Sequence, residues 1–189
     1  MAVLVEAISV VIRRDAIERS YELGWQGFLK DVPNATFCAD TELARVGFMH
    51  PEEVERFTDL LSSRGLVFLS DGECVDISVV DQQRGPTMPC HWLEFGQFGY
   101  GDNSGRISAC WFFEGPRVEN GLHMKSENLE VAMPAGWDYE NSLSAQFTFI
   151  SNDQTDERLR LLHTEDGLDV FLDTEKGHKV FMPSRRKCN

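Results

Sequence analysis

The sequence predicts an α+β fold, with a largely antiparallel sheet and two or three helices contributed mainly by the N-terminal half. Helical periodicity is confined to about residues 1–80, whereas about residues 81–189 form short extended runs separated by turn residues. Helices and strands segregated in this way favour α+β over a parallel α/β fold, in which they alternate along the chain. A length of 189 residues suits one domain, so we expect a single domain over residues 1–189.

The chain opens on a run of β-branched residues over 3–12, which predicts one well-buried strand. Asp15 follows the run and is expected to cap a short helix over residues 16–21. Gly24 and Gly27 come next, and we expect them to break this helix because glycine is a poor helix former.

The clearest helical signal begins at Pro51, after a turn over residues 32–34 and an extended stretch over 36–48 that fits one bent strand or two. Proline suits the first helical position, and the two glutamates after it suit the first turn. Four apolar side chains share one face: Val54, Phe57, Leu60 and Leu61. Gly65 is a typical helix stop, so we predict a helix that ends there.

Extended runs dominate the rest of the chain. Residues 66–69 and 74–80 flank a Ser-Asp-Gly-Glu turn and are predicted to form a hairpin. Further strands are predicted over residues 91–98, 106–113, 143–150, 158–163, 168–172 and 179–182. In the run over 106–113, residues alternate between two faces, so at least one large aromatic side chain is expected to be partly exposed. Residues 115–140 are rich in proline and glycine and are predicted to form a long loop.

The net charge of the chain is −13, and its middle part is the most acidic. Residues 51–150 contain 16 Asp and Glu against 6 Lys and Arg, a local balance of −10. A negative field opposes binding to nucleic acid and to anionic membrane surfaces, and it suits a basic protein partner. The simpler interpretation is that the charge serves solubility alone.

The cysteines and the hydropathy pattern point to a soluble, cytoplasmic protein. The five cysteines are odd in number and scattered along the chain, which argues against a disulfide framework. Residues 1–12 are apolar but lack the basic leader and cleavage site of a signal peptide. No run reaches the roughly 18 apolar residues that a membrane-spanning helix needs.

Several catalytic and cofactor motifs are absent from the sequence. There is no Gly-Lys pair, which excludes the phosphate-binding loop GxxxxGK[ST]. The glycines between residues 96 and 105 do not have GxGxxG spacing, and no GxSxG motif of serine hydrolases occurs. No two cysteines and no two histidines lie within four positions of each other. We therefore expect neither a metal nor a cofactor.

The richest polar stretch is residues 81–94, which join two predicted strands. Its candidate ligand-binding residues are Asp81, Gln82, Gln83, Arg84, Cys90, Trp92 and Glu94. Amide and guanidinium groups offer planar hydrogen bonding, and a tryptophan ring can stack on a ligand. The alternative is a stiff connection in which Arg84 pairs with Asp81 or Glu94.

Cys90 and His91 are adjacent, a pairing that suggests thiol catalysis. Neighbouring residues of a strand point to opposite faces, so these two side chains are not expected to meet. A catalytic pair of Cys90 with His50 or His123 is left as a hypothesis, and no catalytic residue is assigned.

Two functions follow from these observations. In the first, the chain is a non-catalytic interaction or regulatory domain whose acidic part binds a basic protein. In the second, it is a small-molecule-binding or enzymatic domain in which Arg84 anchors an anionic group and Asp81 or Glu94 transfers a proton. The missing catalytic motifs favour the first function.

Overall fold

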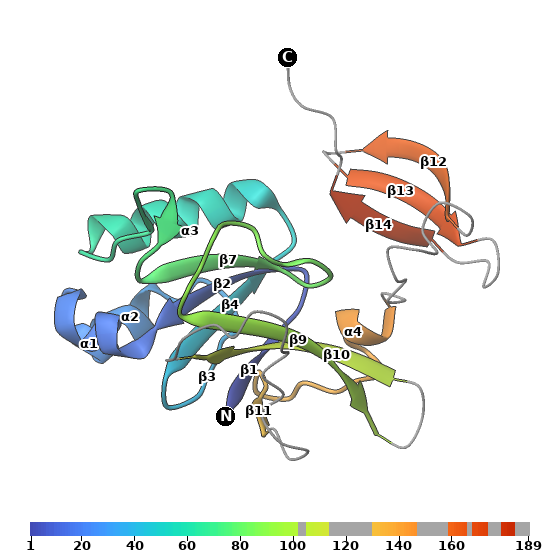
Figure 1. Ribbon diagram of the computed structural model, residues 1–189. Helices are drawn as coiled ribbons and strands as arrows, with labels where there is room; N and C mark the ends of the chain where they lie inside the picture. The colour runs from blue at the N-terminus through green and yellow to red at the C-terminus, as the bar shows by residue number, and fades with distance from the viewer. Residues whose placement is uncertain (102–104, 114–129, 147–158, 166–167, 174–178, 184–189) are drawn as a thin grey trace. The chain divides into compact units, whose positions relative to one another are not determined.

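The computed structural model describes residues 1–101, 105–113, 130–146, 159–165, 168–173 and 179–183 (Figure 1). Contacts divide the chain into two compact units, Met1–Tyr139 and Glu140–Asn189. The sheets are mostly antiparallel, and the three longest helices lie in the N-terminal half, which confirms the α+β class. The prediction of one domain over the full chain stays a prediction.

The described residues of the first unit form three helices and two larger sheets. In chain order its elements are β1 (Ala2–Val5), β2 (Ile8–Arg13), α1 (Arg14–Ser20), α2 (Gly24–Asp31), β3 (Cys38–Ala39), β4 (Leu43–Phe48), α3 (Pro51–Ser63), β5 (Leu69–Ser70), β6 (Glu73–Cys74), β7 (Ile77–Asp81), β8 (Gly85–Pro86), β9 (Leu93–Tyr100), β10 (Gly105–Phe112) and β11 (Val131–Ala132). One sheet has the order β3-β4-β2-β7-β8 and the other β11-β1-β10-β9. All pairs are antiparallel except β1 with β11.

The predicted single strand over residues 3–12 is wrong, because the chain changes sheets within it. β1 pairs with β10 and β2 pairs with β4 and β7. Ala7, between the two strands, has a φ of 48° and exchanges hydrogen bonds with Gln82. An apolar run shows that residues are buried, but it does not show which sheet buries them.

The predicted end of the first helix before Gly24 is confirmed, since α1 ends at Ser20, but a second helix that was not predicted, α2, begins at Gly24 and contains Gly27. A Cβ atom on Gly27 would lie 1.9 Å from the carbonyl oxygen of Glu22. Glycine therefore allows α2 to pack against the preceding turn, and the helix buries Phe28 beside Tyr21, with ring centroids 5.8 Å apart. The N-cap residue of α1 is Arg13 and not the predicted Asp15, which lies in the first turn of the helix.

The predicted helix from Pro51 is confirmed as α3, which ends at Ser63, shortly before Gly65. Gly65 has a φ of 106°, and a Cβ atom there would lie 2.5 Å from the carbonyl oxygen of Ser20. The helix runs along one side of the β2–β4 sheet (Figure 1). Its buried residues Val54, Phe57 and Leu61 join the core there.

The predicted hairpin around the Ser-Asp-Gly-Glu turn is confirmed as β5 and β6. Asp71 and Gly72 both have positive φ, the geometry of a tight two-residue turn. Two more backbone hydrogen bonds, from Val75 to Phe68 and from Asp76 to Val67, extend the pairing. The longer strand β7 instead pairs with β2.

Two apolar layers cover the two faces of the five-stranded sheet. The layer facing the helices contains Val10, Ile12 and residues of α1, α2 and α3. The layer facing the other sheet contains Val11, Trp92 and Cys110. The first 80 residues and the β9–β10 hairpin therefore share this second core.

The second unit contains an antiparallel sheet of order β12-β13-β14. Its strands are β12 (Leu159–Glu165), β13 (Leu168–Asp173) and β14 (Lys179–Pro183), close to the predicted runs. The predicted strand over 143–150 is wrong at its start, where α4 (Leu143–Gln146) forms a short helix. Ser142 explains this, because its hydroxyl accepts a hydrogen bond from the amide of Ala145. Residues 147–150 lie outside the described residues, as do residues 115–129 of the predicted long loop.

Candidate functional site

The predicted polar segment begins with a tight turn at the end of β7. The Asp81 carboxylate accepts hydrogen bonds from the backbone amides of Gln83 and Arg84, at 2.9 Å each. Gly85 closes the turn with a φ of 82°, and a Cβ atom there would lie 2.9 Å from the Phe95 ring. Asp81 therefore shapes the loop, and it makes no ion pair with Arg84 within the described residues.

Gln82 is buried and joins the two sheets. Its side-chain oxygen accepts a hydrogen bond from the amide of Ala7 at 2.8 Å. Its backbone carbonyl accepts one from the Ser108 hydroxyl of β10 at 2.6 Å. The side-chain nitrogen is buried and makes no hydrogen bond within the part of the chain that the structure describes. Gln82 thus holds the fold together at the point where β1 passes into β2.

Trp92 is 2% exposed, so its ring offers no open face for a ligand. Its indole nitrogen donates to the carbonyl oxygen of Cys74 at 3.1 Å, and its ring lies 6.4 Å from that of Phe112. The guanidinium of Arg13 lies near both rings, 5.4 Å from the centroid of Phe112. Packing between the sheets covers the ring.

The remaining predicted residues separate into two groups. Arg84 is exposed, and Gln83 and Glu94 are half-buried. Cys90 is buried in the layer between the sheets. Burial divides the seven predicted residues, so they do not form one open site.

His91 points away from Cys90, as predicted. Its imidazole is exposed and lies 3.6 Å from the Glu73 carboxylate, whereas Cys90 is buried. His50 is exposed and precedes α3, and His123 lies outside the described residues. The hypothesis of a Cys90–histidine pair gains no support from these positions.

Cys90 instead meets a second thiol. The two thiols lie close together in one buried cluster, and their interaction lowers the pKa of Cys74 and raises the pKa of Cys90. The Ser78 hydroxyl is buried near both sulfurs and makes no hydrogen bond within the described residues. The sequence contained no signal for this pair, because sixteen positions separate the two cysteines.

A buried arginine, Arg45, lies in the same layer and was not predicted. It is 1% exposed, and its guanidinium donates to the Ser9 hydroxyl at 2.8 Å, to the carbonyl of Glu6 at 2.9 Å and to the carbonyl of Thr36 at 3.0 Å. Burial lowers the pKa of Arg45, and the Cys38 thiol and Glu6 oppose that shift. A charged residue inside the apolar run 43–48 was the available signal, together with Gly47, where a Cβ atom would lie 2.6 Å from the guanidinium.

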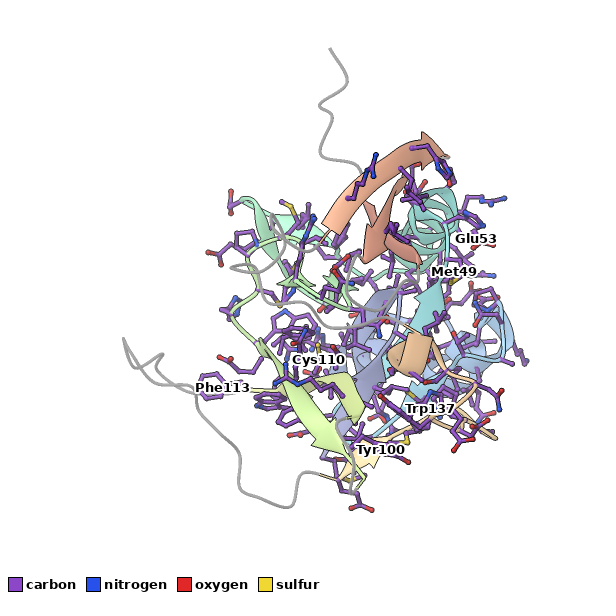
Figure 2. The ribbon with its side chains drawn as sticks, turned by 90° about the vertical axis from the view of Figure 1, so that its right-hand side faces the viewer. Met49, Glu53, Tyr100, Cys110, Phe113 and Trp137 are labelled. Carbon is purple, nitrogen blue, oxygen red and sulfur yellow. The ribbon has the colours of Figure 1, made fainter. Side chains whose placement is uncertain are left out.

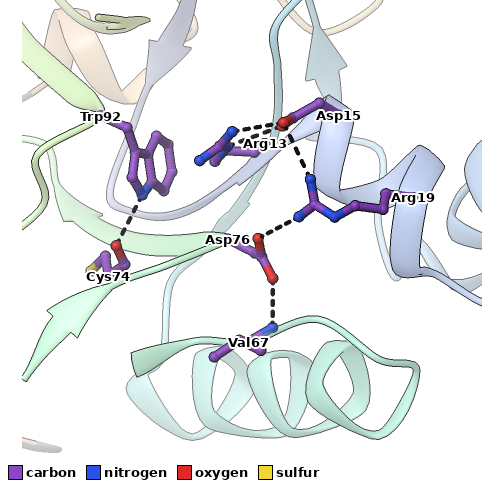
Figure 3. Close-up of polar contacts among 7 residues, drawn as sticks. All are labelled: Arg13, Asp15, Arg19, Val67, Cys74, Asp76 and Trp92. Atoms are coloured by element: carbon purple, nitrogen blue, oxygen red, sulfur yellow. Dashed lines mark hydrogen bonds and ion pairs between the residues drawn. The ribbon is translucent and has the colours of Figure 1, made fainter. Parts of the chain in front are cut away.

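A second charged network ties α1 to the segment after α3 (Figure 3). Arg13 donates two hydrogen bonds to Asp15, which lower the pKa of that carboxyl. Arg19 pairs with both Asp15 and the buried Asp76. Asp76 also accepts a hydrogen bond from the Val67 amide at 2.9 Å. Each charge in this network has a partner, so its role is structural.

The outer face of α3 carries charges without such partners. Glu52, Glu55 and Asp59 are exposed, and spacings of three and four residues place them in one stripe. None of the three makes an ion pair within the described residues. Arg56, the basic residue of the helix, donates from its Nε to the backbone carbonyl of Glu52.

Exposed apolar side chains lie at both ends of this helix. Met49, which precedes α3, is 50% exposed; Figure 2 shows it together with Glu53 at the start of the helix. Leu23 is 74% exposed and has a φ of 62°, a left-handed conformation that leucine rarely adopts. It lies next to Glu22, whose carboxylate pairs with Arg64 at the end of α3.

The described residues contain neither a candidate metal site nor a membrane-spanning helix. Within those ranges, no three His, Cys, Asp or Glu side chains gather as a metal site requires. No helix of the described residues is long and apolar enough to cross a bilayer. Comparison with family models, with curated proteins and with solved structures gave no match to this chain. The function must therefore be inferred from the geometry and chemistry of the chain itself.

Proposed function

We propose that this chain is a non-catalytic interaction or regulatory domain that binds a basic protein partner through the outer face of α3. The observation that carries the proposal is the acidic stripe of Glu52, Glu55 and Asp59, which has no ion-pair partner among the described residues. A basic segment would supply the missing charges. Long-range attraction between opposite charges would also speed its association.

Helix stability does not account for the stripe. Glu52 suits the first turn, where the helix dipole favours negative charge. Glu55 and Asp59, however, form a like-charge pair at i, i+4, which destabilises an isolated helix by about 0.2–0.5 kcal/mol. The last turn of α3 contains no basic residue to offset them. Their presence is therefore better explained by a partner than by the fold.

Apolar anchors complete the surface. Charged rims steer binding, whereas most binding energy comes from a few large side chains that become buried. Met49 and Leu23 are exposed near opposite ends of α3. The left-handed conformation of Leu23 is unfavourable for any residue with a β-carbon. A strained and exposed leucine is costly to the free chain, and contact with a partner would offset that cost.

The test is a selection of displayed random peptides on the wild-type chain, followed by calorimetric titration of the selected peptides. We expect enrichment of sequences that combine Lys or Arg with large apolar residues. The double variant Glu55→Lys/Asp59→Lys should lose at least about tenfold in affinity, about 1.4 kcal/mol. Binding should also weaken as salt is added.

The control is Glu42→Lys/Glu130→Lys, which changes the net charge by the same amount at two other exposed glutamates. Neither glutamate has an ion-pair partner among the described residues. An equal loss of affinity in both double variants would mean nonspecific attraction and would overturn the proposal. Selected peptides without basic residues would overturn it as well.

The alternative, a small-molecule site in residues 81–94, now depends on Arg84, Gln83 and Glu94, because Gln82, Cys90 and Trp92 are buried. It predicts a metabolite that raises the melting temperature of the wild-type chain and has no effect on Arg84→Ala. Such a ligand would replace the interaction proposal as the function of this region.

A further inference from the structure

Two buried thiols are in contact between the sheets of the first unit. Cys74 and Cys90 are 0% and 5% exposed, belong to the same buried cluster and lie close enough for each thiol to affect the ionisation of the other. Their segments also lie side by side, since the Cys74 amide donates to the carbonyl of Pro89 at 2.8 Å. The Trp92 indole donates to the carbonyl of Cys74 and fixes the same segment from the other end.

The two sulfurs differ in chemical character. A thiolate is the reactive form of cysteine, and a hydrogen bond from a neighbouring thiol stabilises it. Cys74 receives this stabilisation, whereas Cys90 provides it. Burial raises the pKa of Cys38 and of Cys110. Among the described cysteines, Cys74 is therefore the expected nucleophile, and Cys90 is placed to resolve the oxidised product.

We propose that Cys74 and Cys90 form an oxidant-sensitive site that a peroxide converts into an intramolecular disulfide. The Cys74 thiolate attacks one oxygen of hydrogen peroxide; the O–O bond breaks, and the leaving hydroxide takes up a proton to become water. Cys74 is then a sulfenic acid. Cys90 attacks this sulfur, the S–O bond breaks, and a second water leaves. Two thiols are oxidised and one peroxide is reduced.

A small oxidant can reach the buried pair because the two cysteines lie beside short, exposed segments of the chain. The β5–β6 hairpin has two residues in each strand. Its turn residues Asp71 and Gly72 are exposed, as are Pro89 and His91 on either side of Cys90. Short exposed elements open locally at low free-energy cost. Hydrogen peroxide needs only a small opening.

The test is peroxide titration of the full chain carrying Cys188→Ser, which removes the cysteine outside the described residues. Remaining thiols are alkylated in denaturant, and the protein is digested with trypsin without reduction. Cleavage after Arg64, Arg84 and Arg106 separates the two cysteines into peptides 65–84 and 85–106. We expect these peptides to be joined by a disulfide at low peroxide, while Cys38 and Cys110 stay alkylated.

Two single variants identify the attacking sulfur. In Cys90→Ser, the sulfenic acid at Cys74 has no resolving thiol and should be trapped by a 1,3-dione reagent. In Cys74→Ser, labelling of Cys90 should be at least about tenfold slower. The rate of disulfide formation in the Cys188→Ser chain should rise with pH through about 7, where the Cys74 thiol ionises.

Oxidation of Cys38 or Cys110 before the linked peptide forms would overturn the proposal. Linkage that occurs only once the chain is unfolded would overturn it too, because the folded contact would then play no part. Circular dichroism of each variant shows whether it is folded. The peptide map of the Cys188→Ser chain decides the question even if a serine variant fails to fold.

Discussion

The two faces of the β3-β4-β2-β7-β8 sheet are both buried, yet they are packed in different ways. On the face toward the helices, apolar side chains such as Val10, Phe57 and Leu61 meet one another. On the face toward the other sheet, Arg45 and Gln82 are buried together with thiols. The helix-side core depends on buried area, whereas the inter-sheet core also depends on specific hydrogen bonds. Replacing a polar side chain by an apolar one between the sheets should therefore cost far more stability than exchanging one apolar side chain for another in the helix-side core.

The largest expected effect comes from replacing one residue of each core by methionine. Arg45→Met removes the donors to Ser9 and to the carbonyls of Glu6 and Thr36; each buried acceptor left unpaired costs about 1–3 kcal/mol, so we expect a loss of about 3 kcal/mol or more in unfolding free energy. Leu61→Met preserves volume and polarity and should cost less than about 1.5 kcal/mol. Urea unfolding followed by tryptophan fluorescence measures both, since all four tryptophans lie in the first unit.

Equal losses in Arg45→Met and Leu61→Met would contradict the comparison. The inter-sheet layer would then tolerate an apolar replacement as the helix-side core does, and the hydrogen bonds of Arg45 would add nothing to stability.

A smaller loss is expected from Gln82→Met. This change leaves the half-buried amide of Ala7 without its acceptor, a cost of about 1 kcal/mol. Hydrogen exchange at the Ala7 amide should accelerate together with the loss of stability. The neighbouring change Gln83→Met is the control: this residue is half-buried, and substitution should stay within about 0.5 kcal/mol. Similar losses at both positions would show that Gln82 does not join the sheets.

Substitution of the exposed Leu23, in contrast, should raise the stability of the chain. Leu23→Asn places a residue that tolerates positive φ at an exposed position, and we expect a gain of about 0.5–1 kcal/mol in stability. Leu29 is exposed too, but lies within α2, so Leu29→Asn should bring no gain. A melting-temperature comparison of the two variants decides the matter. A loss of stability in Leu23→Asn would mean that the leucine packs in the free chain.

The smallest effect concerns Asp15. The hydrogen bond from Arg13 lowers the pKa of this carboxyl, so the pair stabilises the fold above the ordinary carboxyl range and is lost as pH falls through the lowered value. Asp15 is about half exposed, so Asp15→Asn should cost only about 0.5 kcal/mol at neutral pH. The difference from wild type should vanish in acid. A difference that persists in acid would assign the effect to something other than ionisation.

The elements that the sequence predicted correctly are those whose signals are local. Pro51 and the two glutamates after it mark the start of α3, and Gly65 follows its end. The alternating run over 106–113 became β10, with Phe112 and Phe113 half-buried as the pattern indicated. By contrast, the sequence did not predict α2, because glycine is a poor helix former. Gly27 is required there because its backbone lies against the carbonyl oxygen of Glu22, and helix propensity does not describe such a contact.

The candidate site was predicted less well than the fold. A polar stretch at 81–94 does lie in a connection between strands, but side-chain burial decides which of its residues can reach a ligand. Trp92 and Cys90 turn inward because the second sheet covers them. The Cys74–Cys90 contact and the stripe on α3 are the features of chemical interest. Only the stripe was visible in the sequence, as part of the charge balance of residues 51–150.

The sequence by itself determined the class of the fold, the position of α3 and the acidic character of the middle of the chain, because each depends on residues close together along the chain. The tertiary structure decided where residues 3–12 change sheets, where Arg45 is buried and which two thiols meet. These features depend on contacts between segments far apart in sequence, such as Ala7 with Gln82. Such contacts form only because both faces of one sheet must be covered.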